Sequence, residues 1–413
     1  MKLSELKKYK KILILGYGTE GKVTETFLRK YHPEAEIGIA DQAEGPNYLK
    51  KQKEYDLVIK SPGVPLRLIT QKHTTATNIF FHNIQGTIIG ITGSKGKSTT
   101  TTIVYNILKA AGKPAKCVGN IGKPMLAELL RKNSKTMIYV CELSSFQTED
   151  LTKSPDIAVI LNLFPDHMDH HGSVARYYRA KKNIIKHATK KTIFIYNPKI
   201  SALRNLADHT RARSIPVIDR APFTFTTKLM GQHNTQNIMA AITVAKYLRI
   251  ANTAIRHAIQ NTQPLPHRIQ QVGIYRGVTF YDDAIATTPE STIIAIETLK
   301  NVQTILLGGK NRGYHFAKLA RAIKKYRINN IVLFPESGVL IKQSIKQSGF
   351  TPDHILETRS MAQAVRFCYR YTPHGAIALL STASPSYTLW KNFEEKGNEF
   401  QKFVQLQSGK KSK

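Results

Sequence analysis

The stretch Thr87-Ile88-Ile89-Gly90-Ile91-Thr92-Gly93-Ser94-Lys95-Gly96-Lys97-Ser98 decides the fold of this chain. Residues 87–92 form a short apolar run, which predicts a buried strand, and residues 97–111 carry apolar side chains at helical spacing before Gly112. In the glycine-rich turn between them, backbone N–H groups can approach phosphate oxygens at the positive end of a helix. The stretch therefore predicts an α/β domain with a site for a nucleoside triphosphate.

The polar residues of this loop have separate expected roles. Lys97 would reach the outer phosphates and Ser98 would hold a magnesium ion. Ile91 occupies the position of the first glycine in the common phosphate-loop pattern, so a plain glycine turn beside a solvated lysine stays open as an alternative. The residues expected to bind ATP here are Gly93, Ser94, Lys95, Gly96, Lys97, Ser98 and Thr99.

Length and composition exclude several classes of protein. A chain of 413 residues with 41% hydrophobic residues has room for more than one domain and is neither disordered nor fibrous. No apolar run approaches the roughly 20 residues of a membrane span, and residues 1–11 lack the apolar core of a signal peptide, so we expect a cytoplasmic protein. The three cysteines are scattered and have no metal-ligand spacing.

The net charge of +33 is unusual and raises the question of a nucleic-acid partner. Lysine pairs recur along the whole chain, however, without one long basic arm or interleaved aromatic residues. We interpret the charge as a solvated basic surface that attracts nucleotides, and we expect no specific nucleic-acid partner.

Three α/β units are expected along the chain. In the first, residues 1–84, a strand at 11–15 runs into the glycine turn 16–21, and Asp41 follows a second strand, as in a dinucleotide-type βαβ unit. A tight turn without a ligand is the alternative for this glycine pattern. A further strand at 56–59 is followed by Ser61-Pro62-Gly63.

The second unit, residues 85–264, has polar clusters after its expected strands at 137–141 and 158–161. Glu142 begins the first cluster, and Asn162 and His167 belong to the second. Because the carboxyl ends of parallel strands form the ligand edge of a sheet, both clusters should lie near the phosphate loop.

The third unit, residues 265–413, alternates helices with strands at 278–281, 304–307, 331–334 and 376–380. Thr288-Pro289 is typical of a helix start, which places Asp283 in the preceding loop. The expected fold class is α/β, with an N-terminal Rossmann-like domain, a central phosphate-loop domain with a mainly parallel sheet, and a C-terminal Rossmann-like domain.

Eight short motifs occur in one order: residues 92–98, 119–122, 142–147, 166–169, 178–182, 231–237, 265–268 and 391–394. Together they resemble the Mur ligases, over nearly the whole chain. The resemblance implies ATP-dependent amide ligation, in which ATP converts the alanyl carboxylate of UDP-N-acetylmuramoyl-L-alanine to an acyl phosphate and the amine of glutamate then attacks. It also implies a monomer whose partners are these small molecules.

The same resemblance assigns site residues. It implies two Mg²⁺ ions held by Ser98, Glu142, His167 and Lys182, with Lys182 carbamylated and the adjacent Lys181 not. The expected catalytic residues are Lys97, Glu142, His167 and Lys182. The implied binding residues are Asn237, Arg268 and Asp283 for ATP, Gly18, Ser61, Gly63 and Asn120 for the UDP-sugar, and Arg312, Ser386 and Phe393 for glutamate.

Some positions depart from the family pattern. Ile285 stands where the family commonly has lysine, Arg312 replaces a lysine, and Glu20 replaces a small or hydroxyl residue in the diphosphate loop. The departures in the third unit resemble a branch of the family that includes ligases for L-glutamate. D-glutamate stays the first expectation because it is the commoner substrate, and L-glutamate is the alternative. A basic ATPase acting on nucleic acid and a non-catalytic nucleotide-binding descendant are the other hypotheses.

Overall fold

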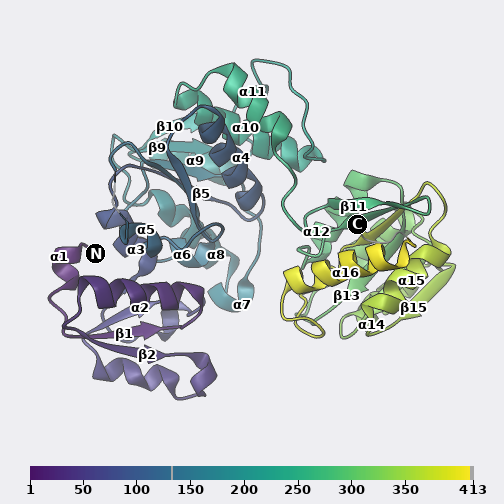
Figure 1. The fold of residues 1–413 in the computed structure, drawn as a ribbon, viewed down its shortest axis with the longest axis horizontal. Helices are drawn as coiled ribbons and strands as arrows, with labels where there is room; N and C mark the ends of the chain where they lie inside the picture. Colours follow the sequence, from purple (N-terminus) through teal and green to yellow (C-terminus); the bar gives the residue numbers. More distant parts are fainter. Residues whose placement is uncertain (132–133, 410–413) are drawn as a thin grey trace. The chain divides into compact units, whose positions relative to one another are not determined.

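The computed structural model describes residues 1–131 and 134–409, which divide into two compact units. The first unit comprises residues 1–228 and 233–262, and the second comprises residues 229–232 and 263 onward. Figure 1 shows helices packed around β-sheets in both units. The predicted α/β class is confirmed.

The first unit contains two sheets in which all strand pairs are parallel. The N-terminal sheet has the order β2-β1-β3-β4 and the second sheet the order β10-β9-β8-β5-β7-β6. The strands are β1 (Lys11–Leu15), β2 (Glu36–Ala40), β3 (Leu57–Lys60), β4 (His73–Thr75), β5 (Thr87–Thr92), β6 (Ala115–Gly119), β7 (Ile138–Glu142), β8 (Ile157–Ile160), β9 (Ile193–Tyr196) and β10 (Arg213–Pro216).

Alternating side chains of β1 enter different cores. Ile12 and Ile14 pack with Phe27 and Phe80, whereas Leu13 and Leu15 face the opposite side of the sheet. The Ile12 core continues into the second sheet, where Tyr139 packs with its ring centroid 5.4 Å from that of Phe80. One apolar core thus joins the two sheets of this unit.

Most helices of the first unit connect its parallel strands, and α2 lies along the N-terminal sheet in Figure 1. They are α1 (Leu3–Leu6), α2 (Thr19–Tyr31), α3 (Ala76–Asn83), α4 (Lys97–Ala110), α5 (Leu126–Leu129), α6 (Ser145–Thr148), α7 (Met168–His171), α8 (Val174–Lys182), α9 (Ser201–His209), α10 (Gln232–Tyr247) and α11 (Asn252–Asn261), with 3₁₀ turns at Gln42–Glu44, Tyr48–Glu54, Leu66–Leu68 and Asn183–Ile185.

The second unit has one sheet of order β11-β12-β16-β13-β14-β15, in which β11 is antiparallel to β12 and the other pairs are parallel. Ile305 and Leu307 of β13 pack on one face, and Leu306 packs on the other. The strands are β11 (Gln270–Tyr275), β12 (Val278–Asp282), β13 (Val302–Gly308), β14 (Asn330–Phe334), β15 (His354–Glu357) and β16 (Ile377–Leu380). The helices are α12 (Pro289–Leu299), α13 (Ala317–Lys325), α14 (Gly338–Gln347), α15 (Met361–Tyr371) and α16 (Phe393–Gln407).

Thr288 caps α12 as predicted, since its hydroxyl accepts from the backbone N–H of Ser291 and Pro289 is the first helical residue. Asp283 lies in the loop before that helix.

Candidate functional site

The glycine-rich loop joins β5 to α4 in the predicted strand, turn and helix arrangement. Gly93 and Gly96 have φ of 154° and 84°, a region that favours glycine. A Cβ on Gly96 would lie 2.2 Å from Oδ1 of Asn237, so the Asn237 carboxamide packs directly on the loop. Glycine at position 96 therefore allows the Asn237 side chain to lie against the loop.

Asn162 holds this loop from the end of β8. Its Oδ1 accepts from the backbone N–H of Lys95 at 2.8 Å, and its Nδ2 donates to the carbonyl of Lys95 at 2.9 Å. The hydroxyl of Tyr177 lies 2.9 Å from that of Ser94. These contacts fix the shape of the loop, a role that the sequence did not reveal for Asn162 or Tyr177.

Lys97 and Ser98 are the first residues of α4. The Lys97 ammonium donates to the carbonyls of Gly93 at 3.0 Å and Ser94 at 3.3 Å, so it lies across the loop. Ser98 is half-buried, and the next side chain, Thr99, is buried with a hydroxyl that has no hydrogen-bond partner among the described residues. The loop thus presents hydroxyl groups and an ammonium at a helix N-terminus.

Glu142 ends β7, beside the loop strand, and its side chain is buried. Asn120, which follows β6, donates to Glu142 Oε1 at 2.8 Å. The other oxygen, Oε2, is buried without a hydrogen-bond partner within the described part of the chain. A buried carboxylate oxygen without a donor is costly unless a ligand satisfies it, and it suits a hard cation such as Mg²⁺.

The two adjacent lysines of α8 have different surroundings. Lys181 is buried and its ammonium donates to the carbonyl of Gly93 at 2.9 Å. Lys182 is half-buried, and no hydrogen bond or ion pair of its side chain occurs among residues 1–131 and 134–409. Successive helical residues point about 100° apart, so only Lys181 faces the loop. Burial, and next the positive charge of Lys97, lower the pKa of Lys181 well below its ordinary value.

His167 precedes α7 and adopts a left-handed backbone with φ of 54°. Its Nε2 lies 3.8 Å from Asp166 Oδ2, and 42% of its side chain is exposed. The Phe146 ring packs against it with centroids 5.0 Å apart. Burial lowers the pKa of His167, although Asp166 opposes this, so a neutral imidazole with an available nitrogen is favoured.

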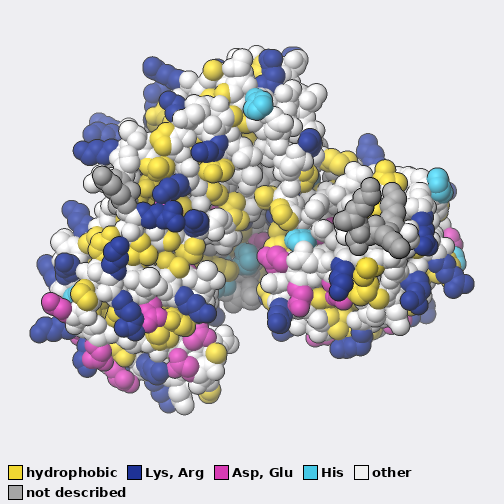
Figure 2. All heavy atoms as spheres, viewed as in Figure 1, with side chains coloured by type: hydrophobic (Ala, Val, Ile, Leu, Met, Phe, Trp, Pro, Cys, Tyr) yellow, Lys and Arg dark blue, Asp and Glu magenta, His cyan; other side chains and the backbone are white. Residues whose placement is uncertain are grey.

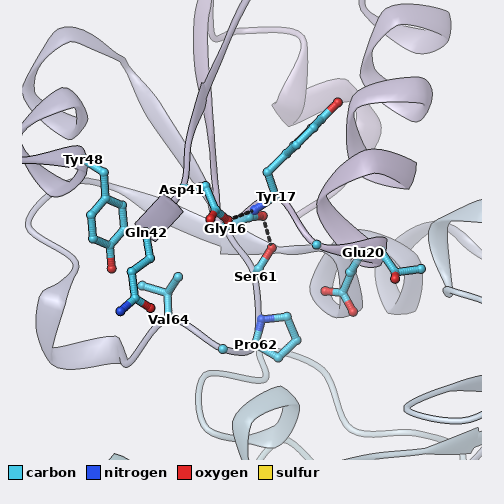
Figure 3. A pocket seen from close by; sticks show the side chains of 12 residues that line it. Gly16, Tyr17, Glu20, Asp41, Gln42, Tyr48, Ser61, Pro62 and Val64 are labelled. Atoms are coloured by element: carbon cyan, nitrogen blue, oxygen red, sulfur yellow. Dashed lines mark hydrogen bonds between the residues drawn. The ribbon is translucent and has the colours of Figure 1, made fainter. Parts of the chain in front are cut away.

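A cavity of about 340 Å³ lies over the N-terminal sheet, lined in part by Gly18, Ser61 and Gly63 (Figure 3). A Cβ on Gly21 would lie 2.4 Å from the carbonyl oxygen of Gly16, so close packing requires that glycine. A Cβ on Gly18 or Gly63 would meet nothing within 4 Å, and neither has positive φ. Protein packing does not explain these two glycines, whereas close approach of a ligand does.

Two polar side chains of the cavity wall form hydrogen bonds within the protein. Ser61 Oγ donates to the carbonyl of Gly16 at 2.6 Å, and Asp41 Oδ2 accepts from the backbone N–H of Tyr17 at 2.6 Å, as Figure 3 shows. Asp41 thus shapes the glycine turn. Hydrogen bonds from the backbone N–H groups of Tyr17 and Ala43 lower the pKa of Asp41.

Glu20 extends into the wall on the side opposite Gln42 and Tyr48 (Figure 3). Its Oε1 is buried without a hydrogen-bond partner among the described residues. Burial raises the pKa of Glu20 to about 7, despite a hydrogen bond from Gln147 and the nearby Lys60 ammonium. A buried carboxyl that ionises near pH 7 therefore stands where the resemblance predicts a small or hydroxyl side chain.

In the second unit, Asp283 is buried and accepts from Ser381 Oγ at 2.8 Å and from the backbone N–H of Ile269 at 3.2 Å. Burial raises its pKa to about 7. Arg268 lies between His267 and Ile269, whose φ values are 59° and 44°. The turn that carries Arg268 is thus bonded to the Asp283 carboxylate.

Two further contacts of the second unit were missed from the sequence. His267 Nδ1 lies 2.7 Å from Asp282 Oδ2. The Lys396 ammonium, buried within α16, donates to Thr382 Oγ1 at 2.6 Å. Lys396 follows the predicted residues 391–394 by two positions, but its burial is not visible in a segment rich in charged residues.

The predicted glutamate residues also lie in the second unit. The Arg312 guanidinium stands 5.9 Å from the ring centroid of Tyr387, next to Ser386. Ser386 Oγ is buried with no hydrogen-bond partner in the described residues, which leaves it available to a ligand. Phe393 begins α16, with its ring centroid 6.0 Å from that of His267.

Within the first unit, the structure therefore brings the phosphate loop, Glu142, Lys181 and Asn237 to one region, with His167 on the neighbouring loop. Gly18, Ser61 and Gly63 line a separate cavity of that unit. Arg268 with Asp283, Arg312 with Ser386, and Phe393 belong to the second unit. No helix among the described residues is long and apolar enough to cross a membrane.

Comparison with known proteins identifies a matching domain family and similar proteins. Residues 91–221 match the Mur ligase middle domain. A UDP-N-acetylmuramoylalanine–D-glutamate ligase of Streptococcus mutans is 32% identical over 440 aligned residues, which cover 95% of this chain and 96% of that protein.

Solved structures share the fold. A UDP-N-acetylmuramate–alanine ligase of Thermotoga maritima superposes with a TM-score of 0.63 at 18% identity, covering 97% of this chain and all of the other. The MurF ligase of the same organism, solved in complex with ADP, gives 0.62 at 16% identity, covering 96% and 95%. With its three sheets and with a relative of this identity over nearly the full length, the chain belongs to the Mur ligase family.

Proposed function

We propose that this protein ligates D-glutamate to UDP-N-acetylmuramoyl-L-alanine with ATP, a step of peptidoglycan precursor synthesis. The name of the Streptococcus mutans relative supports the substrates, because the match spans nearly both chains. The observation that carries the proposal is the buried Glu142 carboxylate beside the phosphate loop, with Oε2 lacking a hydrogen-bond donor among the described residues. That arrangement suits ATP with Mg²⁺.

The residues present fit the ions that the family implies. Ser98 and Glu142 would hold the ion at the ATP phosphates, and His167 with a modified Lys181 would hold a second. Bound magnesium neutralises phosphate charge and polarises the transferred phosphoryl group. Lys97, which lies across the loop, would move to the outer phosphates.

The proposed reaction has two steps. An oxygen of the alanyl carboxylate attacks the γ-phosphorus of ATP, so ADP leaves and an acyl phosphate forms. The amine of glutamate then attacks the acyl carbon, loses a proton and expels inorganic phosphate, which leaves an amide. The loop's backbone N–H groups and Lys97 stabilise the negative charge that develops on the phosphoryl oxygens.

We further propose that the carbamate forms on Lys181 and not on Lys182. The amine of Lys181 would add to carbon dioxide and release a proton, so that a cation becomes an anion that ligates metal. Its position 2.9 Å from the Gly93 carbonyl supports this assignment. So does its lowered pKa, because the neutral amine is the nucleophile.

The remaining assignments are proposals of the same kind. Asn237, Arg268 and Asp283 would bind the nucleotide, and the open glycines Gly18 and Gly63 would admit the diphosphate of the UDP-sugar, with Ser61 beside it. Asn120 would contact the sugar or its lactyl-alanine arm. Arg312, Ser386 and Phe393 would bind glutamate, and Arg312 offers a bidentate partner for its side-chain carboxylate. We keep the domain boundaries 1–84, 85–264 and 265–413, and we propose a cytoplasmic monomer.

The test is phosphate release from ATP with every combination of UDP-N-acetylmuramoyl-L-alanine, D-glutamate and L-glutamate. We expect release only when the UDP-sugar and D-glutamate are both present. Phosphate release with the UDP-sugar and L-glutamate, but not with the UDP-sugar and D-glutamate, would identify L-glutamate as the substrate. The departure at Ile285 is the reason to test this enantiomer. Release with neither enantiomer, or release stimulated by DNA or RNA instead, would contradict the ligase proposal.

A further inference from the structure

Two histidines and a glutamate form a compact cluster that none of the roles above uses. Glu149 follows α6, and His170 and His171 end α7. Exposed fractions of the three side chains are 19%, 8% and 0%, respectively. The cluster is thus nearly closed to solvent, and none of its three residues belongs to the set proposed to hold ATP or Mg²⁺.

The separations between ligand atoms match a small metal site. Glu149 Oε2 lies 3.5 Å from His170 Nε2, and Glu149 Oε1 lies 3.7 Å from His171 Nδ1. One ligand atom from each residue falls within 4.8 Å of the others. Tetrahedral zinc with bonds of about 2.0–2.2 Å needs ligand atoms about 3.3–3.5 Å apart, so small side-chain shifts close the site.

His171 supplies the second, independent sign of a missing ligand. Its Nδ1 is buried and has no hydrogen-bond partner in the part of the chain that the structure describes. Its other nitrogen, Nε2, lies 3.0 Å from Ser145 Oγ. A metal-binding histidine characteristically uses one ring nitrogen for the metal and the other for an orienting hydrogen bond.

We propose that Glu149, His170 and His171 bind one divalent transition-metal ion of the zinc class, with water in the fourth position. Imidazole nitrogen favours zinc, cobalt or nickel over magnesium, which prefers oxygen ligands. The buried Lys60 ammonium nearby is paired with Asp150 at 3.8 Å. This proposal does not depend on the proposed ligase activity.

The place of the cluster gives the ion a structural role. It would tie α6 to α7, and α7 begins directly after His167. Arg67, which follows the N-terminal strand β3, donates to the backbone carbonyl of His170 at 2.5 Å. A bound ion would therefore fix the segment that carries His167 and link it to the N-terminal sheet.

The test uses the full chain freed of metal with a chelator and then dialysed against excess Mg²⁺. Zn²⁺ and Co²⁺ are titrated separately, with metal content, the visible cobalt spectrum and thermal unfolding as readouts. We expect one bound equivalent, a tetrahedral cobalt spectrum and a melting temperature that rises with Zn²⁺. His170→Gln and Glu149→Gln should lose all three responses, and their metal-free melting curves report whether they fold.

Two controls separate this cluster from other sites. His209→Gln alters an exposed histidine of α9 and should bind metal like the wild type. Glu142→Gln alters the proposed magnesium site and should also retain the zinc equivalent. The proposal is overturned if the wild type binds no zinc. It is also overturned if His170→Gln still binds one equivalent of zinc and Glu142→Gln does not.

Discussion

Lys181 is a lysine whose charge the fold disfavours. Its side chain is buried, and the Lys97 ammonium adds repulsion. Such a position is costly for a permanent cation, and lysines of lowered pKa are characteristic of catalytic sites. A covalent change that makes the side chain anionic would replace repulsion by attraction to the metal and the neighbouring ammonium groups.

Replacing the two lysines separately tests this assignment. We expect Lys181→Ala to lower kcat by at least about 100-fold, because an electrostatic group aimed at the reacting phosphate is lost. Lys182→Ala should change kcat by less than about threefold, since its side chain forms no hydrogen bond or ion pair with any residue that the structure describes. Short carboxylic acids should partly restore Lys181→Ala. The account fails if Lys182→Ala is the inactive variant.

The sequence contains the signal that distinguishes these lysines. Tyr177, Lys181 and Ile184 follow the i, i+4, i+7 spacing of a buried helical face, and all three are buried. The prediction of Lys182 used Tyr178-Arg179-Ala180 as the anchor and did not use this period. Contacts between distant segments, such as Asn162 with Lys95, depend on the loop conformation and have no comparable periodic signal.

Glu20 makes stability depend on pH in a defined direction. Its pKa rises from 4.5 in the unfolded chain to about 7 in the folded protein. Between these values the folded protein keeps a proton that the unfolded chain releases, so rising pH favours unfolding until the folded carboxyl also ionises.

Glu20→Gln should therefore match the wild type near pH 4 and exceed it above pH 7 in free energy of unfolding, by up to about 3 kcal/mol. Urea unfolding at both pH values measures the difference. Glu34→Gln, at an exposed position before β2, is the control and should show no such pH dependence. A gap that stays constant from pH 4 to 8 would refute the buried protonated state.

At the level of elements, most interior strands were predicted, whereas β2 was the one edge strand among the described residues that was predicted. The apolar runs gave β1, β5, β8 and β14 to within about one residue. The strands β4, β6, β10, β11 and β15 lie at sheet edges, where solvent-facing positions carry polar residues and the apolar pattern is lost. The interior strand β9 was also missed.

The glycines of the β1 to α2 turn make a matched pair for a test. Gly21→Ala should destabilise the fold by about 1–3 kcal/mol, because its Cβ would lie 2.4 Å from the Gly16 carbonyl oxygen. Gly18→Ala should leave the free energy of unfolding within about 1 kcal/mol of the wild type.

For Gly18→Ala we expect the KM for the UDP-sugar to rise roughly tenfold, the equivalent of about 1.4 kcal/mol of lost backbone contact. Unfolding curves and steady-state kinetics measure the two effects. An unchanged KM for the UDP-sugar would contradict the proposal that its diphosphate binds in this cavity.

At the scale of the whole molecule, the net charge of +33 is spread widely. Figure 2 shows Lys and Arg side chains over all parts of the visible face, interspersed with hydrophobic and uncharged ones. This distribution is that of a solvated basic surface. We expect DNA to bind weakly at low salt, to dissociate as salt rises, and to leave ATP turnover unchanged. A salt titration of DNA binding alongside turnover checks this, and DNA-stimulated turnover would contradict it.

Activation of a carboxylate by ATP is the central claim, and it can be followed by oxygen transfer. UDP-N-acetylmuramoyl-L-alanine labelled with oxygen-18 in its alanyl carboxylate is incubated with ATP, Mg²⁺ and D-glutamate, and the released phosphate is analysed by mass spectrometry. An acyl phosphate predicts one labelled oxygen in each phosphate. Unlabelled phosphate formed together with the amide product would contradict the account.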